Sequence, residues 1–323
     1  MILRKNKMER GDNVKNSKKK TVEYGKYGVI FLVPFFVVFF VFQFYPLMYT
    51  IFKSFLYDKR TGLKDFTTEL GMGNYIEYVF GGNGEFWQAM GVTIVLWLLN
   101  FIPQILLSLL LAAWFTDSHN KLKGTGAFKV IMYMPNIITA ASISVLFFNL
   151  FNVNGSITKE LINIGLVDKV GFMDKGFGSL LLIAFIQFWM WYGNTMIVLI
   201  AGILGINPSL YEAAMVDGAT SKQQFFKITV PLLMPILQYT LVTSAIGGLQ
   251  MYDIPQLLNK GGPIITFGGK SLKTTTTVVM LIKQFASEGT AQNLGRASAY
   301  SVVLFVVTLC VSLVFYRLTA KKN

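Results

Sequence analysis

Six long apolar runs dominate the pattern of hydrophobic and polar positions along this 323-residue chain. Each run is about 20 residues or more, the length that an α-helix needs to cross a bilayer, and none shows the alternation of a barrel strand. The pattern therefore predicts an all-α, polytopic membrane protein with six transmembrane helices. The predicted spans are 27–49, 90–115, 130–151, 178–204, 232–252 and 297–316.

The polar segments that join these runs carry an uneven charge. With the N-terminus inside, the outer segments hold 12 basic and 10 acidic residues, whereas 17 basic and 6 acidic residues fall in the inner segments 1–26, 116–129, 205–230 and 317–323. Lysine and arginine concentrate on the cytoplasmic side of membrane proteins, so both termini are predicted to be cytoplasmic. The predicted domains are a basic N-terminal tail (1–26), a transmembrane domain (27–316) and a C-terminal tail (317–323).

One inner connector, SLYEAAMVDGATSKQQFFKITVPLLMP at 209–235, has more internal structure than the others. Ser209 and Glu212 have the spacing of a capping box, which predicts a helix that starts at Leu210. Gly218 supplies the residue that ends a helix in the left-handed conformation.

The capping pattern then repeats at Ser221 and Gln224. Pro231 ends this second helix or begins the following span. Two short helices joined at a glycine form a compact protrusion, here called the knob, on which another protein can dock. The alternative is an amphipathic surface helix whose phenylalanines face lipid.

The sequence lacks the residues that several functions require. The predicted spans contain no Asp, Glu, Lys, Arg or His, so a path through them suits a neutral solute and has no evident proton relay. The chain has no phosphate-binding loop, and the single histidine, His119, and the single cysteine, Cys310, do not make a metal site. We therefore expect no enzyme activity and no cofactor, with energy supplied by another subunit.

The connector motif resembles that of binding-protein-dependent ABC transporter permeases. Their pattern E-A-A-x-x-x-G, followed by I-x-L-P, matches Glu212 to Gly218 and Ile228 to Pro231, with Val230 in place of leucine. The segments from Met251 to Pro263 and from Arg296 to Ser301 resemble the carbohydrate branch, the maltose and multiple-sugar permeases. The resemblance covers roughly residues 28–320 and is to the first of the two permease subunits.

The resemblance implies a type I ABC importer permease in the bacterial cytoplasmic membrane, importing a neutral sugar or oligosaccharide. It implies a second homologous permease, an extracytoplasmic solute-binding protein and two ATPase subunits that bind ATP and magnesium. The coupling loop, expected at 205–231, would dock on the ATPase from the cytoplasmic side. Its expected coupling residues are Glu212, Ala213, Ala214, Asp217, Gly218, Phe225, Ile228 and Pro231.

Aromatic and neutral polar residues in the fourth and fifth spans suit a sugar, which presents C–H faces and hydroxyl edges. In the related permeases these two spans supply the sugar contacts. The expected substrate-path residues are Trp191, Tyr192, Asn194, Ser244, Gly248, Gln250 and Met251. The alternatives are helix packing for the small residues and interface anchoring for the aromatic ones. Asn100 and Pro103 are interpreted as kink and packing positions.

Two other functions stay open on the sequence. One is a permease for a glycerol phosphate, a phosphodiester or another small solute, for which Arg296 and Lys283 are the candidate cations near the outer end. The other is a non-conducting membrane scaffold that uses the knob for docking. Solute flux through the reconstituted complex separates transport from scaffolding.

Overall fold

The computed structural model describes residues 25–60, 66–81, 84–117, 123–166, 171–267, 270–287 and 293–320. The chain divides into two units, residues 1–49 and 50–323. The predicted first span is helical throughout, as α1 (Gly25–Phe39), the π-turn η1 (Phe40–Phe44) and α2 (Tyr45–Ser54). Its apolar side chains are exposed, as a lipid-facing helix requires. His119 lies outside the described residues.

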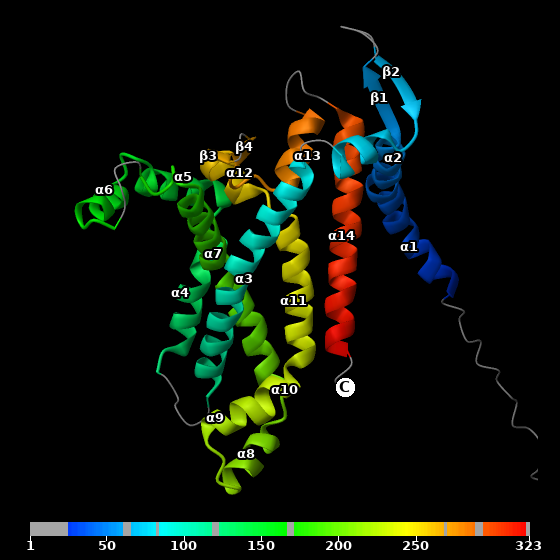
Figure 1. Cartoon of the computed structure of the whole chain (residues 1–323). Helices are drawn as coiled ribbons and strands as arrows, with labels where there is room; N and C mark the ends of the chain where they lie inside the picture. The colour runs from blue at the N-terminus through cyan, green and yellow to red at the C-terminus, as the bar shows by residue number, and fades with distance from the viewer. Residues whose placement is uncertain are drawn as a thin grey trace, which may run out of the picture. The chain divides into compact units, whose positions relative to one another are not determined.

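Within the second unit, three predicted spans form single long helices. They are α3 (Glu85–Thr116), α7 (Gly176–Leu204) and α14 (Leu294–Ala320). Helices α3 and α7 pack along each other, and α11 (Met234–Leu249) contacts both α3 and α14. Figure 1 shows these helices running side by side.

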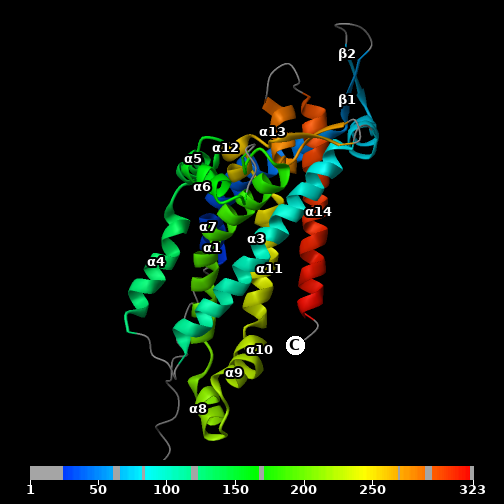
Figure 2. The ribbon, with the colours of Figure 1, turned by 60° about the vertical axis from the view of Figure 1, so that its left-hand side comes forward.

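The predicted third span, 130–151, is wrong as a single helix. It forms α4 (Thr125–Ile137), which packs on α7, and α5 (Ala140–Phe151), which turns away from α4 (Figures 1 and 2). The chain breaks because Thr139 is extended and its side chain accepts a hydrogen bond from the Ser142 amide at 3.3 Å, which caps α5.

The predicted fifth span, 232–252, is also interrupted. The helix bends by 64° at Leu233, between α10 (Val230–Leu232) and α11, and α11 ends at Leu249. Five helices of the described chain are long and apolar enough to cross a membrane, or six if this bent pair is one span. The fold is therefore that of an all-α, multi-pass membrane protein.

The shorter elements of the second unit gather at two opposite ends of the bundle (Figure 1). Helices α8 (Pro208–Val216) and α9 (Ser221–Gln224) lie at one end and continue through η3 (Phe225–Thr229) into α10. The other end holds α6 (Ser156–Asn163), α12 (Asp253–Asn259), α13 (Val278–Ser287), η2 (Tyr75–Phe80) and the hairpins β1–β2 (Leu56–Arg60, Phe66–Leu70) and β3–β4 (Ile264–Phe267, Lys270–Lys273).

Hydrogen bonds that are buried or partly buried hold this second end together. The Asn259 side chain donates to Ser179 Oγ at 3.1 Å and to the Gly262 carbonyl at 2.6 Å, and it accepts from Thr275 Oγ1 at 3.1 Å. Thr277 Oγ1 donates to the Met251 carbonyl at 2.7 Å. The described parts of the 253–296 segment, 253–267, 270–287 and 293–296, thus form a packed cap that fixes the chain where α11 ends.

Arg296 joins four elements at the same end. Its guanidinium donates to Glu85 at 2.7 Å and to Tyr300 Oη at 2.9 Å. Its Cζ lies 3.8 Å from the ring centre of Phe285 and 4.5 Å from that of Tyr78. The side chain is 18% exposed, so this arginine works as a structural clamp between α14, α3, α13 and η2.

This clamp predicts a specific loss of stability. Arg296→Ala removes charge-assisted hydrogen bonds that contribute about 2 kcal/mol, which lowers the melting temperature of the detergent-solubilised protein by about 5 °C. Arg296→Lys keeps the charge without the planar guanidinium, so its melting temperature should lie between those of wild type and Arg296→Ala. Arg317→Ala, at an exposed arginine, is the matched control. Equal melting temperatures for wild type and Arg296→Ala would contradict the clamp.

Candidate functional site

The first helix of the coupling loop begins two residues earlier than the sequence pattern predicts. Asn207 is its N-cap, with a side-chain oxygen that accepts from the Ser209 amide at 3.1 Å, and Pro208 occupies the first turn. Asparagine is among the best N-caps and proline is pre-organised for the first helical position. The predicted capping box of Ser209 and Glu212 is therefore wrong.

The glycine joint is confirmed. Helix α8 ends at Val216, and Gly218 has φ +75°, a conformation that L side chains rarely adopt. The Ala219 amide donates to the Ala214 carbonyl at 2.9 Å and the Gly218 amide donates to the Met215 carbonyl at 3.0 Å. These two bonds form a Schellman motif, which satisfies the last carbonyls of the helix.

The second helix also starts one residue before the predicted position. Thr220 is the N-cap, and its capping box is completed by Gln223, whose Oε1 accepts from the Thr220 amide at 2.8 Å. Gln224 is instead buried and donates to the Ala219 carbonyl at 3.3 Å. Pro231 does not end the helix, which continues through η3 to Leu232.

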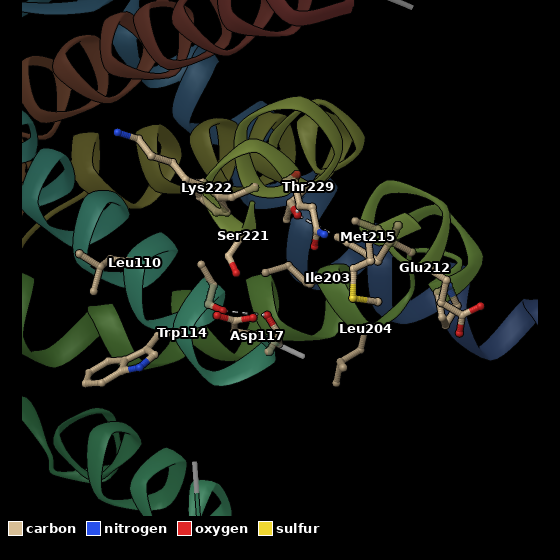
Figure 3. Close-up of a pocket in the computed structure, with 17 residues that line it drawn as sticks. Leu110, Trp114, Asp117, Ile203, Leu204, Glu212, Met215, Ser221, Lys222 and Thr229 are labelled. Atoms are coloured by element: carbon tan, nitrogen blue, oxygen red, sulfur yellow. Dashed lines mark hydrogen bonds between the residues drawn. The ribbon is translucent and has the colours of Figure 1, made fainter. Parts of the chain in front are cut away.

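A cavity of about 570 Å³ lies between this loop and the adjoining ends of α3 and α7 (Figure 3). Its walls are mostly apolar, and the hydroxyls of Tyr211 and Thr229, 2.9 Å apart, tie α8 to η3. Glu212 and Phe225 are the predicted coupling residues that line it. The lining also includes Leu110, Trp114, Asp117, Leu204, Met215 and Lys222.

The other face of the loop is open. Among the predicted coupling residues, Ala213, Asp217, Gly218 and Pro231 are exposed, as is Glu212, while Ala214, Phe225 and Ile228 are half-buried. Three apolar side chains outside the set of predicted coupling residues are prominent on this surface. Leu210 is 45% exposed, Phe226 60% and Val216 88%. Their apolar character in a polar connector was the available signal.

A second cavity, of about 460 Å³, lies among α3, α7 and α11. Six of the seven predicted substrate-path residues line it together: Trp191, Asn194, Ser244, Gly248, Gln250 and Met251. Cavities of about 300–1,000 Å³ are typical of small-molecule sites. The structure thus brings residues about fifty positions apart in sequence into one chamber.

Tyr192 is the exception, because it does not line this cavity. It is 7% exposed and packs in the core with Leu199 and Met196, away from the chamber. Its hydroxyl donates to Met132 Sδ of α4 at 3.4 Å. Tyr192 therefore lies on the side of α7 that packs against α4, whereas Trp191 lines the cavity.

Helix α3 contributes a wall of this chamber that the sequence interpretation did not include. Trp97, Asn100 and Gln104 line it, and the Asn100 side chain donates to the Leu96 carbonyl of its own helix at 2.9 Å. Gln104 Nε2 donates to Thr195 Oγ1 at 2.7 Å, so α3 and α7 are joined by a polar contact beside the cavity. The signal was present, because these three residues share one face of α3.

The chamber offers uncharged polar chemistry. Its lining combines indoles, hydroxyls and side-chain amides with small and apolar groups. Among the described lining residues, Asp253 is the only carboxylate and no lysine or arginine is present. The Tyr252 hydroxyl, at the same end, accepts a hydrogen bond from Lys283. Such a surface can stack on and hydrogen-bond to a polyhydroxylated solute.

Known proteins match the chain along nearly its whole length. The lactose transport system permease protein LacF of Rhizobium radiobacter is 28% identical over 300 residues, covering 93% of this chain and 96% of the relative. The trehalose/maltose transport system permease protein MalF of Thermococcus litoralis is 28% identical over 310 residues, covering 95% and 97%. No protein-family model matches.

A solved structure has the same fold. A chain from a bacterial ABC transporter involved in the import of the acidic polysaccharide alginate superimposes with a TM-score of 0.73 and 22% identity, covering 93% of this chain and 98% of that one. The fold of this chain is therefore that of an ABC importer permease, and its relatives confirm the resemblance to the permeases of sugar ABC transporters.

Proposed function

We propose that this chain is a transmembrane permease subunit of an ATP-driven ABC importer that carries a neutral sugar or oligosaccharide into the cytoplasm. The observation that carries the proposal is the pairing of two features in one bundle. An aromatic, amide-lined chamber lies among α3, α7 and α11, and a glycine-jointed loop lies at one end of those helices. The relatives named for lactose and trehalose/maltose transport support a saccharide as the solute.

The loop is proposed to receive force from an ATPase on the cytoplasmic side. Its exposed Leu210, Val216 and Phe226 provide apolar area for a socket, and the Schellman joint keeps the two helices at a fixed angle. The excess of lysine and arginine in the inner segments supports the cytoplasmic placement of this loop and of both termini. Two ATPase subunits would bind ATP and magnesium, and a second permease would complete the path.

The solute is proposed to be delivered by an extracytoplasmic binding protein to the end of the bundle that holds α12 and α13. One of the structural neighbours was solved in complex with a periplasmic protein that holds an alginate pentasaccharide. Its identity of 22% supports the fold alone, so its acidic solute does not transfer to this chain. The proposed solute class is argued from the lining of the chamber instead.

An uncharged solute fits that lining better than an anionic one. Asp253 repels an acidic saccharide at the chamber, and a desolvated carboxylate without a cationic partner is costly. Arg296, which sequence reasoning kept as a candidate cation for a phosphate ester, is held by Glu85 and by aromatic rings. Lys283 donates to Tyr252. These contacts argue against the glycerol phosphate alternative, and the chamber itself argues against a scaffold.

The coupling role predicts that disrupting the loop stops transport without stopping assembly. Gly218→Pro cannot adopt φ +75°, and Glu212→Lys reverses a charge on the loop, so both should abolish ATP-driven saccharide uptake in proteoliposomes. Gly126→Ala, at a glycine with open space around it, is the control. Membrane insertion should persist in all three. Normal uptake by both loop variants would rule out the proposed coupling.

The observed N-caps predict which residues of the loop stabilise α8 and α9. Asn207→Ala and Thr220→Ala each remove about 1 kcal/mol of capping, so amide hydrogen exchange across α8 and α9 should accelerate about fivefold. Ser209→Ala and Ser221→Ala change neighbouring residues that do not cap and should leave exchange unchanged. The reverse ranking, with the serine variants more labile, would restore the capping boxes predicted from sequence.

The charge of the chamber predicts the solute class. In proteoliposomes of the assembled transporter with its binding protein, a neutral saccharide such as lactose or raffinose should stimulate ATP hydrolysis at least about tenfold better than digalacturonate. Asp253→Asn should narrow this gap by relieving repulsion of the uronate. Equal stimulation by digalacturonate would show that the path accepts anions.

A further inference from the structure

The two adjacent glycines of α11, Gly247 and Gly248, both line the chamber but differ in the space around them. A Cβ on Gly248 would overlap Cδ1 and Cγ of Trp97, so glycine at this position leaves the room that the indole occupies. A Cβ on Gly247 would meet no atom within 4 Å, and Gly247 is exposed. The space at Gly247 therefore belongs to the chamber and not to a neighbouring side chain.

Trp97 makes the wall beside these glycines rigid. Its indole nitrogen donates to Ser244 Oγ at 3.1 Å, one turn before Gly248. Its ring is stacked on Phe101 at 5.8 Å and lies 6.0 Å from Phe315 of α14. The side chain is 5% exposed and held by these three contacts, so it cannot easily retreat to enlarge the chamber. Gly247, next to Gly248, is the glycine of the pair whose Cβ position is open.

We propose that Gly247 is a specificity-determining residue that sets the upper size of the solute, by leaving open the volume that any side chain there would occupy. The proposal rests on the proposed transport of a saccharide through this chamber. It assigns separate roles to neighbouring positions: Gly248 positions Trp97, and Gly247 admits the solute. A side chain at 247 extends into open space and excludes the largest solutes first.

The competing explanation is that Gly247 lets another helix approach closely, since small residues often mark helix packing in membranes. The second permease of an assembled importer is such a neighbour. In that case position 247 is covered in the complex, and a side chain there disturbs assembly instead of solute size. The two explanations differ in whether water reaches position 247 in the assembled transporter.

Accessibility is tested first, because it does not depend on knowing the sugar. The free Cys310 is replaced by serine, and Gly247→Cys and Gly248→Cys are introduced separately into the assembled transporter in proteoliposomes. The probe is the water-soluble thiol reagent 2-(trimethylammonium)ethyl methanethiosulfonate. We expect Gly247→Cys to react at least about tenfold faster than Gly248→Cys, which sits against Trp97. No reaction of Gly247→Cys would overturn the proposal in favour of helix packing.

Solute size is tested second, with uptake of lactose, raffinose and stachyose, which have two, three and four sugar units. Gly247→Ala and Gly247→Leu should lower uptake in order of solute size, with stachyose lost first. Gly248→Ala should lower uptake of all three alike, because it displaces Trp97. An equal loss for all three in Gly247→Leu, or no loss, would overturn the size role.

The two tests separate failure of this inference from failure of the proposed function. If the wild-type transporter carries none of the three saccharides, the proposed solute class fails, while the labelling rates still decide whether position 247 opens into the chamber. If saccharides are carried and Gly247→Cys is labelled, but Gly247→Leu shows no size dependence, the transport function stands and the inference is wrong.

Discussion

The structure depends on one constraint: polar groups inside a bilayer must be satisfied, and charge there is expensive. This chain meets it by concentrating uncharged polar side chains on the facing sides of α3, α7 and α11. Some of them satisfy one another, as Gln104 and Thr195 do, and as Trp97 and Ser244 do. Others line the chamber among the three helices. The same helix faces therefore serve both packing and the proposed contact with a solute.

The two ends of the bundle are stabilised by different kinds of contact. At one end, Asn259, the threonines at 275 and 277 and the Arg296 clamp lock the chain around the chamber. At the other, a short loop is held by local caps and a glycine joint, and it presents exposed apolar side chains. This difference suits a rigid solute site joined to an element that moves as a unit. The bend at Leu233 connects the loop directly to α11, which bears the glycines of the chamber.

The sequence pattern predicted the helical membrane fold, because runs of apolar residues reflect the bilayer directly. It failed where a local polar contact outweighed hydrophobicity. Thr139 caps α5 and divides the predicted third span, and α11 ends before Gln250 because the cap at the far end fixes Met251 through Thr277. The N-caps were predicted one or two residues too late, because Asn207 and Thr220 occupy the N-cap positions instead of Ser209 and Ser221. Such competition is visible only once backbone angles are known.

The chamber was predictable in part. Helical periodicity grouped Ser244 and Gly248 of α11 on the face that lines the chamber, but no local pattern showed that Tyr192 packs against α4 instead. The contribution of α3 depended on which face of that helix meets α7, which no local pattern reveals. The most direct measurement is a density map of the assembled transporter with a bound neutral saccharide. We expect saccharide density against Trp191, Asn194 and Gly247, with α8 seated in an ATPase subunit. Saccharide density elsewhere, with α8 touching no ATPase, would contradict the proposed function.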